Sequence, residues 1–325
     1  MGKMTMVEAI NMAHAFEITQ DPSVVVLGED VGVNGGVFRA TAGLQQRFGK
    51  ARVQDTPLAE GLIAGAAIGL AASGLKPVAE IQFMGFIYPA LDQIASHMAR
   101  LRNRTRGRLT CPLVLRMPHG GGIHAPEHHS ESLEALLCHH PGLRVVCPSS
   151  PARAYGLLLA AIRDPDPVMF LEPVRLYRFA RQDVDDDGQA LPIGRCFVLR
   201  AGTDLTIVSW GAMTVDCLKA AEQMETEGVS CEVIDVATLA PLDLDTILES
   251  VARTGRLLIV HEAVRTAGLG AEIAAVVAEQ ALYDLEGPIR RVTGYDTIMP
   301  LYRLEHDFIP GIARVLDGIR ATLAD

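Results

Sequence analysis

The strongest structural signal lies in Asp55-Thr56-Pro57-Leu58-Ala59-Glu60-Gly61 and the run Leu62-Ile63-Ala64-Gly65-Ala66-Ala67-Ile68-Gly69-Leu70 that follows it. No charged residue appears between Glu60 and Lys76, so one carboxylate opens a small, apolar segment. Such a segment is typical of a buried helix whose Gly and Ala residues let a backbone or a flat ligand approach closely. The simpler interpretation of Glu60 is an acid at the positive end of a helix dipole. Because a buried carboxylate without a partner is costly, Glu60 is expected either to have a fixed partner or to be held for chemistry.

Composition limits the class of protein. The chain has 325 residues, of which 49% are hydrophobic and 21% charged, so we expect a large core and two domains. The net charge of −10 argues against nucleic acid as the main partner. No run of eighteen uncharged apolar residues is present, and Glu8 interrupts the N-terminus, so neither a membrane span nor a secretory signal is expected. Six scattered cysteines without a CxxC pair indicate free thiols in a reducing cytoplasm, and they do not favour a zinc site.

Short β-branched runs alternate with helical runs along the chain. This alternation predicts an α/β fold with a mostly parallel sheet covered on both faces. The acidic stretch 183–187, followed by Gly188, predicts a domain boundary, with a first domain over 1–182, a linker over 183–191 and a second domain over 192–325. The expected strands cover 24–27, 77–81, 113–116, 144–147, 168–171, 205–209, 231–235, 256–260 and 289–292, and the expected helices 59–74, 88–104, 132–140, 152–163, 213–227, 243–253, 268–282 and 307–323.

Ligands of open parallel sheets bind beyond the carboxyl ends of the strands. This rule brings Glu29, Gln82 and the loop after Arg116 to one edge, and Glu60 could open a helix at that edge. The loop after Arg116 is rich in histidine, the side chain that exchanges protons near neutral pH. The alternatives for His124, His128 and His129 are surface solvation and a transition-metal site, and their spacing gives little support to a metal.

Other motifs carry weaker signals. Phe86 follows Gly85, which leaves room for a planar ring to stack on the phenyl group, although ordinary core packing is the alternative. The glycine-rich pieces do not match the dinucleotide fingerprint GxGxxG. The chain has neither a Walker phosphate loop nor a GxSxG nucleophile elbow, so chemistry by its own nucleophile has little support.

Several motifs, taken in order, resemble one family over nearly the whole chain. This family is the β subunit of the thiamine-diphosphate-dependent 2-oxo acid dehydrogenase, the decarboxylating first component of large complexes. Bacterial pyruvate dehydrogenase β chains look most similar, and branched-chain 2-oxo acid (2-oxoisovalerate) and acetoin dehydrogenase β chains are near rivals. The motifs are Gly28-Glu29-Asp30-Val31-Gly32, Gly35-Gly36-Val37-Phe38-Arg39-Ala40-Thr41, Arg52–Glu60, Glu80-Ile81-Gln82-Phe83, Gly120–Glu127, His129–Glu134, Phe170–Pro173 and Leu176-Tyr177-Arg178.

The resemblance implies a transketolase-like fold, in which a pyrimidine-binding domain precedes a transketolase C-terminal domain. It implies that Glu60 hydrogen-bonds ring nitrogen N1′ of thiamine diphosphate and so promotes activation of the cofactor for attack on a 2-oxo acid. It further implies that Phe86 packs on the pyrimidine ring and that His129 assists acyl transfer to the lipoyl group. His124 is carried over as a cofactor-site residue, and Glu29 and Gln82 as residues that support the pyrimidine pocket.

The family's Gly-Asp-Gly motif with its distant Asn, which holds the diphosphate and magnesium, is absent here. The resemblance therefore implies an α subunit that supplies this end of the site, in a heterotetramer of two α and two β chains. The implied partners also include a dihydrolipoyl acyltransferase core with its lipoyl domain, and a small 2-oxo acid as substrate. A purely structural assembly protein and a split transketolase or deoxyxylulose-phosphate synthase half remain alternatives, although the rim lacks clear sugar-phosphate-binding arginines.

Some family members bind potassium near the segment that corresponds to 161–167. The resemblance implies a potassium site at Ala161, Asp164 and Asp166, and the equal alternative is an ordinary turn that ends a helix.

Overall fold

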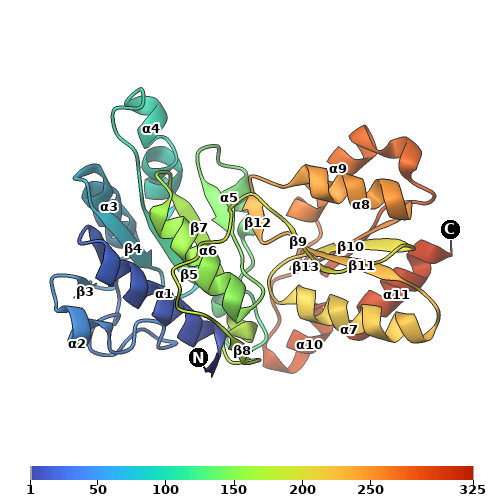
Figure 1. Cartoon of the computed structure of the whole chain (residues 1–325), viewed down its shortest axis with the longest axis horizontal. Coiled ribbons are helices and arrows are strands. Elements are labelled where there is room, and N and C mark those ends of the chain that lie inside the picture. The colour runs from blue at the N-terminus through green and yellow to red at the C-terminus, as the bar shows by residue number, and fades with distance from the viewer. Residues whose placement is uncertain (1, 325) are drawn as a thin grey trace. The chain divides into compact units, whose positions relative to one another are not determined.

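The computed structural model describes residues 2–324, which form two compact units (Figure 1). Unit 1 contains the chain up to His119 and Leu136–Ile193, and unit 2 contains Gly120–Ala135 and the chain from Gly194 onward. The histidine-rich segment Gly120–Ala135 lies inside the range expected for the first domain, yet it packs with unit 2.

Unit 1 is built on a parallel sheet with the order β6-β7-β5-β4-β2-β3. Its central strands are buried on both faces, which explains their near-continuous apolar sequences. The strands are β2 (Val24–Gly28), β3 (Val53–Asp55), β4 (Lys76–Glu80), β5 (Val114–His119), β6 (Arg144–Val146) and β7 (Val168–Pro173), and a small antiparallel pair joins β1 (Lys3–Met4) to β8 (Gln182–Asp183).

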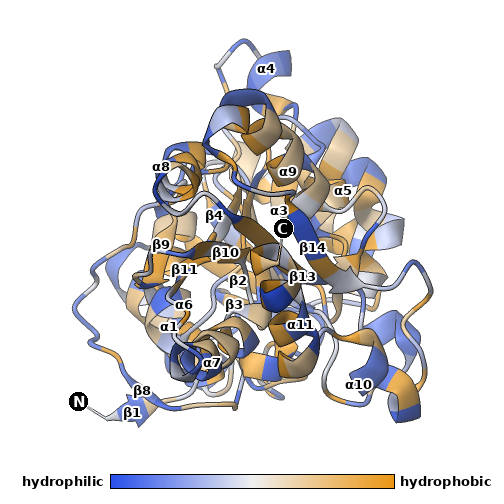
Figure 2. Cartoon of the chain, turned by 90° about the vertical axis from the view of Figure 1, so that its right-hand side faces the viewer, coloured by the Kyte–Doolittle hydropathy of each residue, from blue (hydrophilic) through white to orange (hydrophobic). Residues whose placement is uncertain are grey.

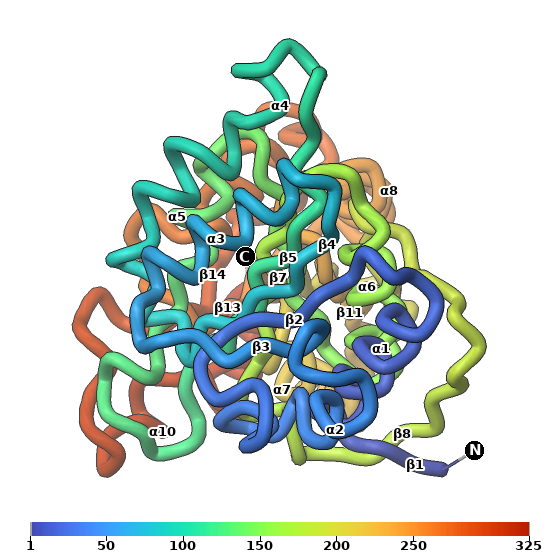
Figure 3. The backbone as a smooth tube through the Cα atoms, turned by 90° about the vertical axis from the view of Figure 1, so that its left-hand side faces the viewer, coloured from blue at the N-terminus to red at the C-terminus, as the bar shows by residue number. Residues whose placement is uncertain are grey.

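Helices cover both faces of this sheet. The helices α1 (Met6–Gln20) and α6 (Pro151–Arg163) lie side by side on one face, and α3 (Glu60–Ala72) lies on the other (Figures 1 and 3). The sequence interpretation missed α1, although a capping box marks its start: Thr5 accepts from the Glu8 amide and the Glu8 carboxylate accepts from the Thr5 amide.

The prediction of one regular α-helix over 88–104 is wrong. The structure has a 3₁₀ segment, η1 (Met84–Ala90), a π-helical turn, η2 (Gln93–Met98), and only a short α4 (Leu101–Arg104). Pro89 lies inside η1, where it lacks an amide hydrogen and disfavours a continuous α-helix. The remaining short segments outside unit 2 are α2 (Leu44–Phe48) and η4 (Val174–Leu176), while α5 (Glu134–Cys138) begins in unit 2 and ends in unit 1.

Unit 2 has a sheet in the order β14-β13-β10-β11-β9, in which β9 alone runs antiparallel to its neighbour. Figure 2 shows hydrophobic residues on its central strands, between α8 and α9 on one side and α7 and α11 on the other. The elements are β9 (Phe197–Arg200), β10 (Leu205–Ser209), β11 (Cys231–Asp235), β12 (Thr238–Ala240), β13 (Leu257–Val264), β14 (Arg290–Gly294), α7 (Met213–Thr226), α8 (Leu244–Thr254), α9 (Leu269–Gln280), α10 (Glu305–Phe308), α11 (Ile312–Leu323), η3 (Glu127–His129), η5 (Leu282–Asp284) and η6 (Tyr302–Leu304).

Candidate active site

The carboxyl ends of three neighbouring strands in unit 1 lie level with one another. Gly28 at the end of β2 pairs with Asp55 at the end of β3 and with Glu80 at the end of β4. The residues that follow these strands, among them Glu29 and Gln82, therefore leave the sheet at one edge. This edge is where open parallel sheets bind their ligands.

Glu60 is the first residue of α3 and is half-buried. Its carboxylate makes no hydrogen bond or ion pair with any residue in the range 2–324. The hydroxyl of Thr56 is buried and likewise has no hydrogen-bond partner in this part of the chain. The helix N-terminus favours negative charge, but it does not use the carboxylate as a hydrogen-bonding group. Two polar groups of one motif are thus available to a ligand.

The first turn of α3 lies close against η1. A Cβ atom added to Gly61 would lie 3.1 Å from the carbonyl oxygen of Pro89, which is tighter than ordinary contact. The glycine after Glu60 is therefore needed for the approach of these two segments. This contact fixes the position of Glu60 relative to the segment that carries Phe86.

Glu29 faces the same edge and is only 7% exposed. Burial raises the pKa of the Glu29 carboxyl, and the negative charges of Glu60, Asp30 and Glu80 raise it further. Glu29 and Glu60 are therefore close enough to influence each other's charge. Glu29 therefore holds a proton more readily than a solvated glutamate does.

Phe86 belongs to a row of aromatic rings. It contacts Phe83 edge-on with ring centroids 5.5 Å apart, Phe83 contacts Phe38 at 5.5 Å, and Phe38 contacts Tyr177 at 5.0 Å. Phe86 itself is half-buried, whereas Phe83 and Tyr177 are buried. Ring packing therefore holds Phe86 against the core. Gln82, also expected at the pocket, is half-buried just before this row.

A buried ion network lies beneath this row, and the sequence interpretation missed it. The guanidinium of Arg116, 1% exposed, donates to both carboxylate oxygens of Glu172 at 2.7 Å and also to Glu80. The Tyr177 hydroxyl donates to Glu172, which in turn raises the pKa of that hydroxyl together with its burial. Burial raises the pKa of Glu80; the Arg116 charge opposes this rise, and the Glu172 charge adds to it. The sequence did contain a signal for this network, because each of three apolar strands carries a charged residue.

The histidines expected at the site lie in unit 2. His124 is exposed, has a positive φ of 59°, and its Nδ1 lies 3.3 Å from Oε2 of Glu305. His129 ends η3, is half-buried, and its amide donates to the Pro126 carbonyl at 2.9 Å. Within residues 2–324 no group of at least three His, Cys, Asp or Glu side chains is arranged as a metal site.

The segment expected to bind potassium ends α6. Asp164 is the C-cap of this helix, and its carboxylate accepts from the Asp166 amide at 2.8 Å, as in an Asx turn. The carboxylates are also ion-paired, Asp164 with Arg144 at 3.0 Å and Asp166 with Arg102 at 2.5 Å. The Ala161 carbonyl accepts from the Asp164 amide. These contacts favour the helix-ending turn, and the potassium site stays a prediction.

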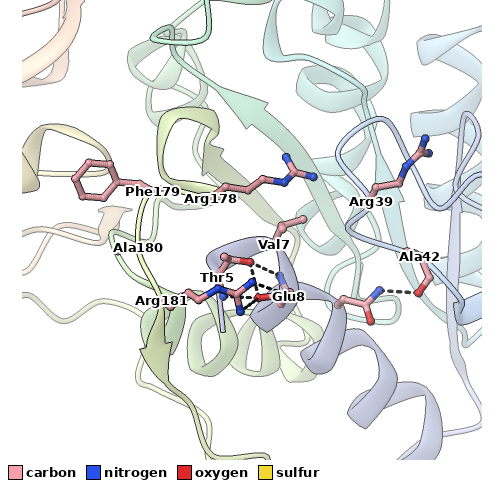
Figure 4. A pocket seen from close by; sticks show the side chains of 10 residues that line it. Thr5, Val7, Glu8, Arg39, Ala42, Arg178, Phe179, Ala180 and Arg181 are labelled. Atoms are coloured by element: carbon pink, nitrogen blue, oxygen red, sulfur yellow. Dashed lines mark hydrogen bonds and ion pairs between the residues drawn. The ribbon is translucent and has the colours of Figure 1, made fainter. Parts of the chain in front are cut away.

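Unit 1 also has a pocket beside its N-terminus, where Arg39, Arg178 and Arg181 gather (Figure 4). Each guanidinium donates to a backbone carbonyl, and Arg181 also pairs with Glu8 at 3.1 Å. These arginines therefore tie surface segments together, and they lie outside the set of residues expected at the site.

Comparisons with known proteins place the chain in a family. The family model "Transketolase, pyrimidine binding domain" matches residues 2–180, and "Transketolase, C-terminal domain" matches residues 194–315. The chain is 51% identical over 320 residues to "Pyruvate dehydrogenase E1 component subunit beta" of Acholeplasma laidlawii, with 98% of each chain covered. It is 49% identical over 323 residues to the protein of the same name from Bacillus subtilis (strain 168), with 99% of each covered.

A solved structure agrees with the fold. "Split gene transketolase, inactive beta4 tetramer" has a TM-score of 0.82 and 25% identity, with 99% of each chain covered. The transketolase-like α/β fold expected from the motifs is thus confirmed. No helix among the described residues is long and apolar enough to cross a lipid bilayer. The chain belongs to the family of pyruvate dehydrogenase E1 component β subunits, as the sequence motifs predicted.

Proposed function

We propose that this chain is the β subunit of a pyruvate dehydrogenase first component, which decarboxylates pyruvate and transfers the acetyl group to lipoyl groups of an acyltransferase core. The relatives that share about half of its sequence carry that name. The observation that carries the proposal is the half-buried carboxylate of Glu60, which opens an apolar helix and has no partner among residues 2–324.

The residues at the sheet edge fit the aminopyrimidine of thiamine diphosphate. Glu60 and Thr56 offer polar groups without a partner in the described chain, and Phe86 offers a half-buried aromatic ring. When bound, thiamine diphosphate supplies the electron sink for loss of carbon dioxide. Glu60 would hold a proton at ring nitrogen N1′, Phe86 would pack on the ring, and Glu29 and Gln82 would support the pocket.

The pKa of Glu29 bears on how Glu60 performs this role. Because burial and the Glu60 charge raise the pKa of Glu29, a proton is retained more readily on Glu29 than on a solvated glutamate. Glu29 therefore places less negative charge beside Glu60 than a fully ionised carboxylate would.

An α subunit would supply the diphosphate and magnesium end of the site. The outer face of α3 supports such a partner, because Leu62 is 51% exposed, Ala66 and Gly69 are also exposed, and the helix has no charged residue after Glu60. An apolar helix side next to the site suits a protein contact better than water. We propose a heterotetramer of two α and two β chains in the cytoplasm, assembled on a dihydrolipoyl acyltransferase core.

His129 would assist transfer of the acyl group to the lipoyl group, and His124 would lie beside the cofactor site. The residue ranges proposed for the domains are 1–182 and 192–325, joined by 183–191. A potassium ion at Ala161, Asp164 and Asp166 would compete with the arginines that pair with both carboxylates, so for this segment we propose the helix-ending turn.

The proposal is tested by reconstituting the chain with its α subunit, thiamine diphosphate and magnesium. Carbon dioxide release is measured with pyruvate and with 2-oxoisovalerate, cleavage of acetoin is measured separately as acetaldehyde formed, and each component is omitted in turn. We expect turnover with pyruvate, and only when the α subunit is present. Full turnover by this chain alone would refute a shared site, and preference for 2-oxoisovalerate would reassign the substrate.

A further inference from the structure

The histidine segment Gly120–Ala135 is held at both ends by buried side chains of unit 2. Near its start, the backbone amides of Gly121, Gly122 and His124 donate to two carboxylates. Near its end, Oε1 of Glu134 accepts from Nε1 of Trp210 at 3.1 Å, and both of these residues are buried. The part between these ends carries His128 and His129.

Glu305 makes most of the contacts at the start. It is 1% exposed, its Oε1 accepts from the Gly122 amide at 2.6 Å, and its Oε2 accepts from the His124 amide at 3.0 Å. Oε2 also lies 3.3 Å from Nδ1 of the His124 ring. Glu262, 5% exposed, accepts from the Gly121 amide. The backbone amides of one short stretch therefore donate to two buried carboxylates. Hydrogen bonds to a charged acceptor are strong and depend on direction, so these bonds fix the path of the stretch.

The backbone at this point needs such support. Gly120 and Gly122 have φ angles of 79° and 94°, and His124 has a φ of 59°, which residues with a side chain seldom adopt. A Cβ atom added to Gly120 would lie 2.9 Å from Oε1 of Glu262. The conformation and its carboxylate partners thus fit each other closely.

The end of the segment near Glu134 is also held by contacts with buried side chains. The indole of Trp210 stacks on the ring of His261, with centroids 5.1 Å apart and planes 13° apart. His261 and Glu262 are neighbours on β13, so one strand supports both ends of the segment. Unit 2 therefore fixes the path of the histidine segment.

We propose that Glu262 and Glu305 are positioning residues that place His124 and His129 for acyl transfer, an inference that rests on the proposed function. In that transfer the lipoyl S–S bond breaks, one sulfur forms a bond to the acyl carbon, and the bond from that carbon to the cofactor then breaks. The other sulfur takes a proton, and the two electrons left by decarboxylation reduce the disulfide. The proton donor must be held where the second sulfur arrives. Decarboxylation precedes this step and does not need that donor.

The first test measures backbone hydrogen exchange and does not depend on enzymatic activity. Hydrogen exchange of the peptide 120–131 is measured in the assembled complex for wild type, Glu305→Gln, Glu305→Ala and the control Glu222→Gln, whose side chain is exposed on α7. We expect exchange of this peptide to rise by about tenfold in Glu305→Ala, less in Glu305→Gln and not at all in Glu222→Gln. Unchanged exchange in Glu305→Ala would overturn the proposal.

A second test separates the two half-reactions. Decarboxylation of pyruvate is followed with an artificial electron acceptor, and acetylation of a lipoyl domain is followed separately in the same preparations. We expect Glu305→Gln to lower lipoyl acetylation by about tenfold and decarboxylation by less than about threefold. Equal losses in both half-reactions, or no loss in acetylation, would refute the positioning role. If the wild type decarboxylates no 2-oxo acid, the proposed function fails, while the exchange result still decides the positioning claim.

Discussion

Replacing Arg116 by Met removes the only guanidinium from the buried network with Glu80 and Glu172. Methionine fills a similar volume but carries no charge. In the wild type the single positive charge of Arg116 balances one of the two carboxylates, so the variant has one more buried carboxylate without a counter-charge. A carboxyl group with an ordinary pKa of 4.5 takes up a proton at pH 7 at a cost of about 3.4 kcal/mol, because each pH unit corresponds to about 1.36 kcal/mol. At pH 5.5 the same protonation costs about 1.4 kcal/mol. The destabilisation should therefore shrink as the solution becomes more acidic.

Thermal unfolding of the purified protein at pH 7.0 and pH 5.5 measures this effect. With about 2–4 °C per kcal/mol for domains of this size, the midpoint of Arg116→Met should fall by roughly 7–14 °C at pH 7.0 and by roughly 3–6 °C at pH 5.5. The control Arg108→Met, on an exposed arginine, should leave the midpoint unchanged at both pH values. Equal losses for Arg116→Met at the two pH values would refute the reasoning, as would a loss under about 1 kcal/mol at pH 7.0.

Three further predictions follow from single features. Leu62→Asp, on the exposed side of α3, should weaken binding of the α subunit at least about tenfold, as measured by calorimetry. The matched control Leu282→Asp, whose side chain is 57% exposed in unit 2, should not weaken it. Equal binding of both variants would show that α3 is not in the interface. Burial, aided by the Arg116 charge, lowers the pKa of His14 to about 3, so its contribution to stability is complete above pH 6.5 and is lost as the pH falls. Between pH 6.5 and 5.0 the free energy of unfolding should drop by about 1.6 kcal/mol more in wild type than in His14→Asn, and parallel pH curves would contradict this. Replacing potassium by sodium should leave the thermal midpoint unchanged, because Asp164 and Asp166 are already paired with arginines, and a shift of several degrees would instead support the potassium site.

The parts of the fold that follow from local sequence were predicted well. Buried parallel strands such as β2 and β7 are near-continuous apolar runs in the sequence, and Glu60 stands out because no charged residue follows it until Lys76. The helix α1 was missed because its apolar residues do not form one clear stripe, although the capping box of Thr5 and Glu8 was visible. Pro89 was the local warning that 88–104 would not be a regular helix.

The contacts that hold the candidate site could not be predicted in the same way. Arg116 and Glu172 are 56 positions apart, and Gly122 and Glu305 are 183 positions apart. A charged residue in an apolar strand indicates that it has a buried partner, but which residue is the partner depends on the order of the strands in the sheet. For the same reason, membership of Gly120–Ala135 in unit 2 has no local signature, since it depends on carboxylates at Glu262 and Glu305.

Carbon dioxide release by the reconstituted complex that carries Glu60→Gln tests the central claim most directly. Glutamine keeps the shape of the side chain but cannot hold a proton at the ring nitrogen, so we expect the rate to fall by at least about a hundredfold while the thermal midpoint and binding of the α subunit stay as in wild type. A near-normal rate in this folded, assembled variant would contradict the account.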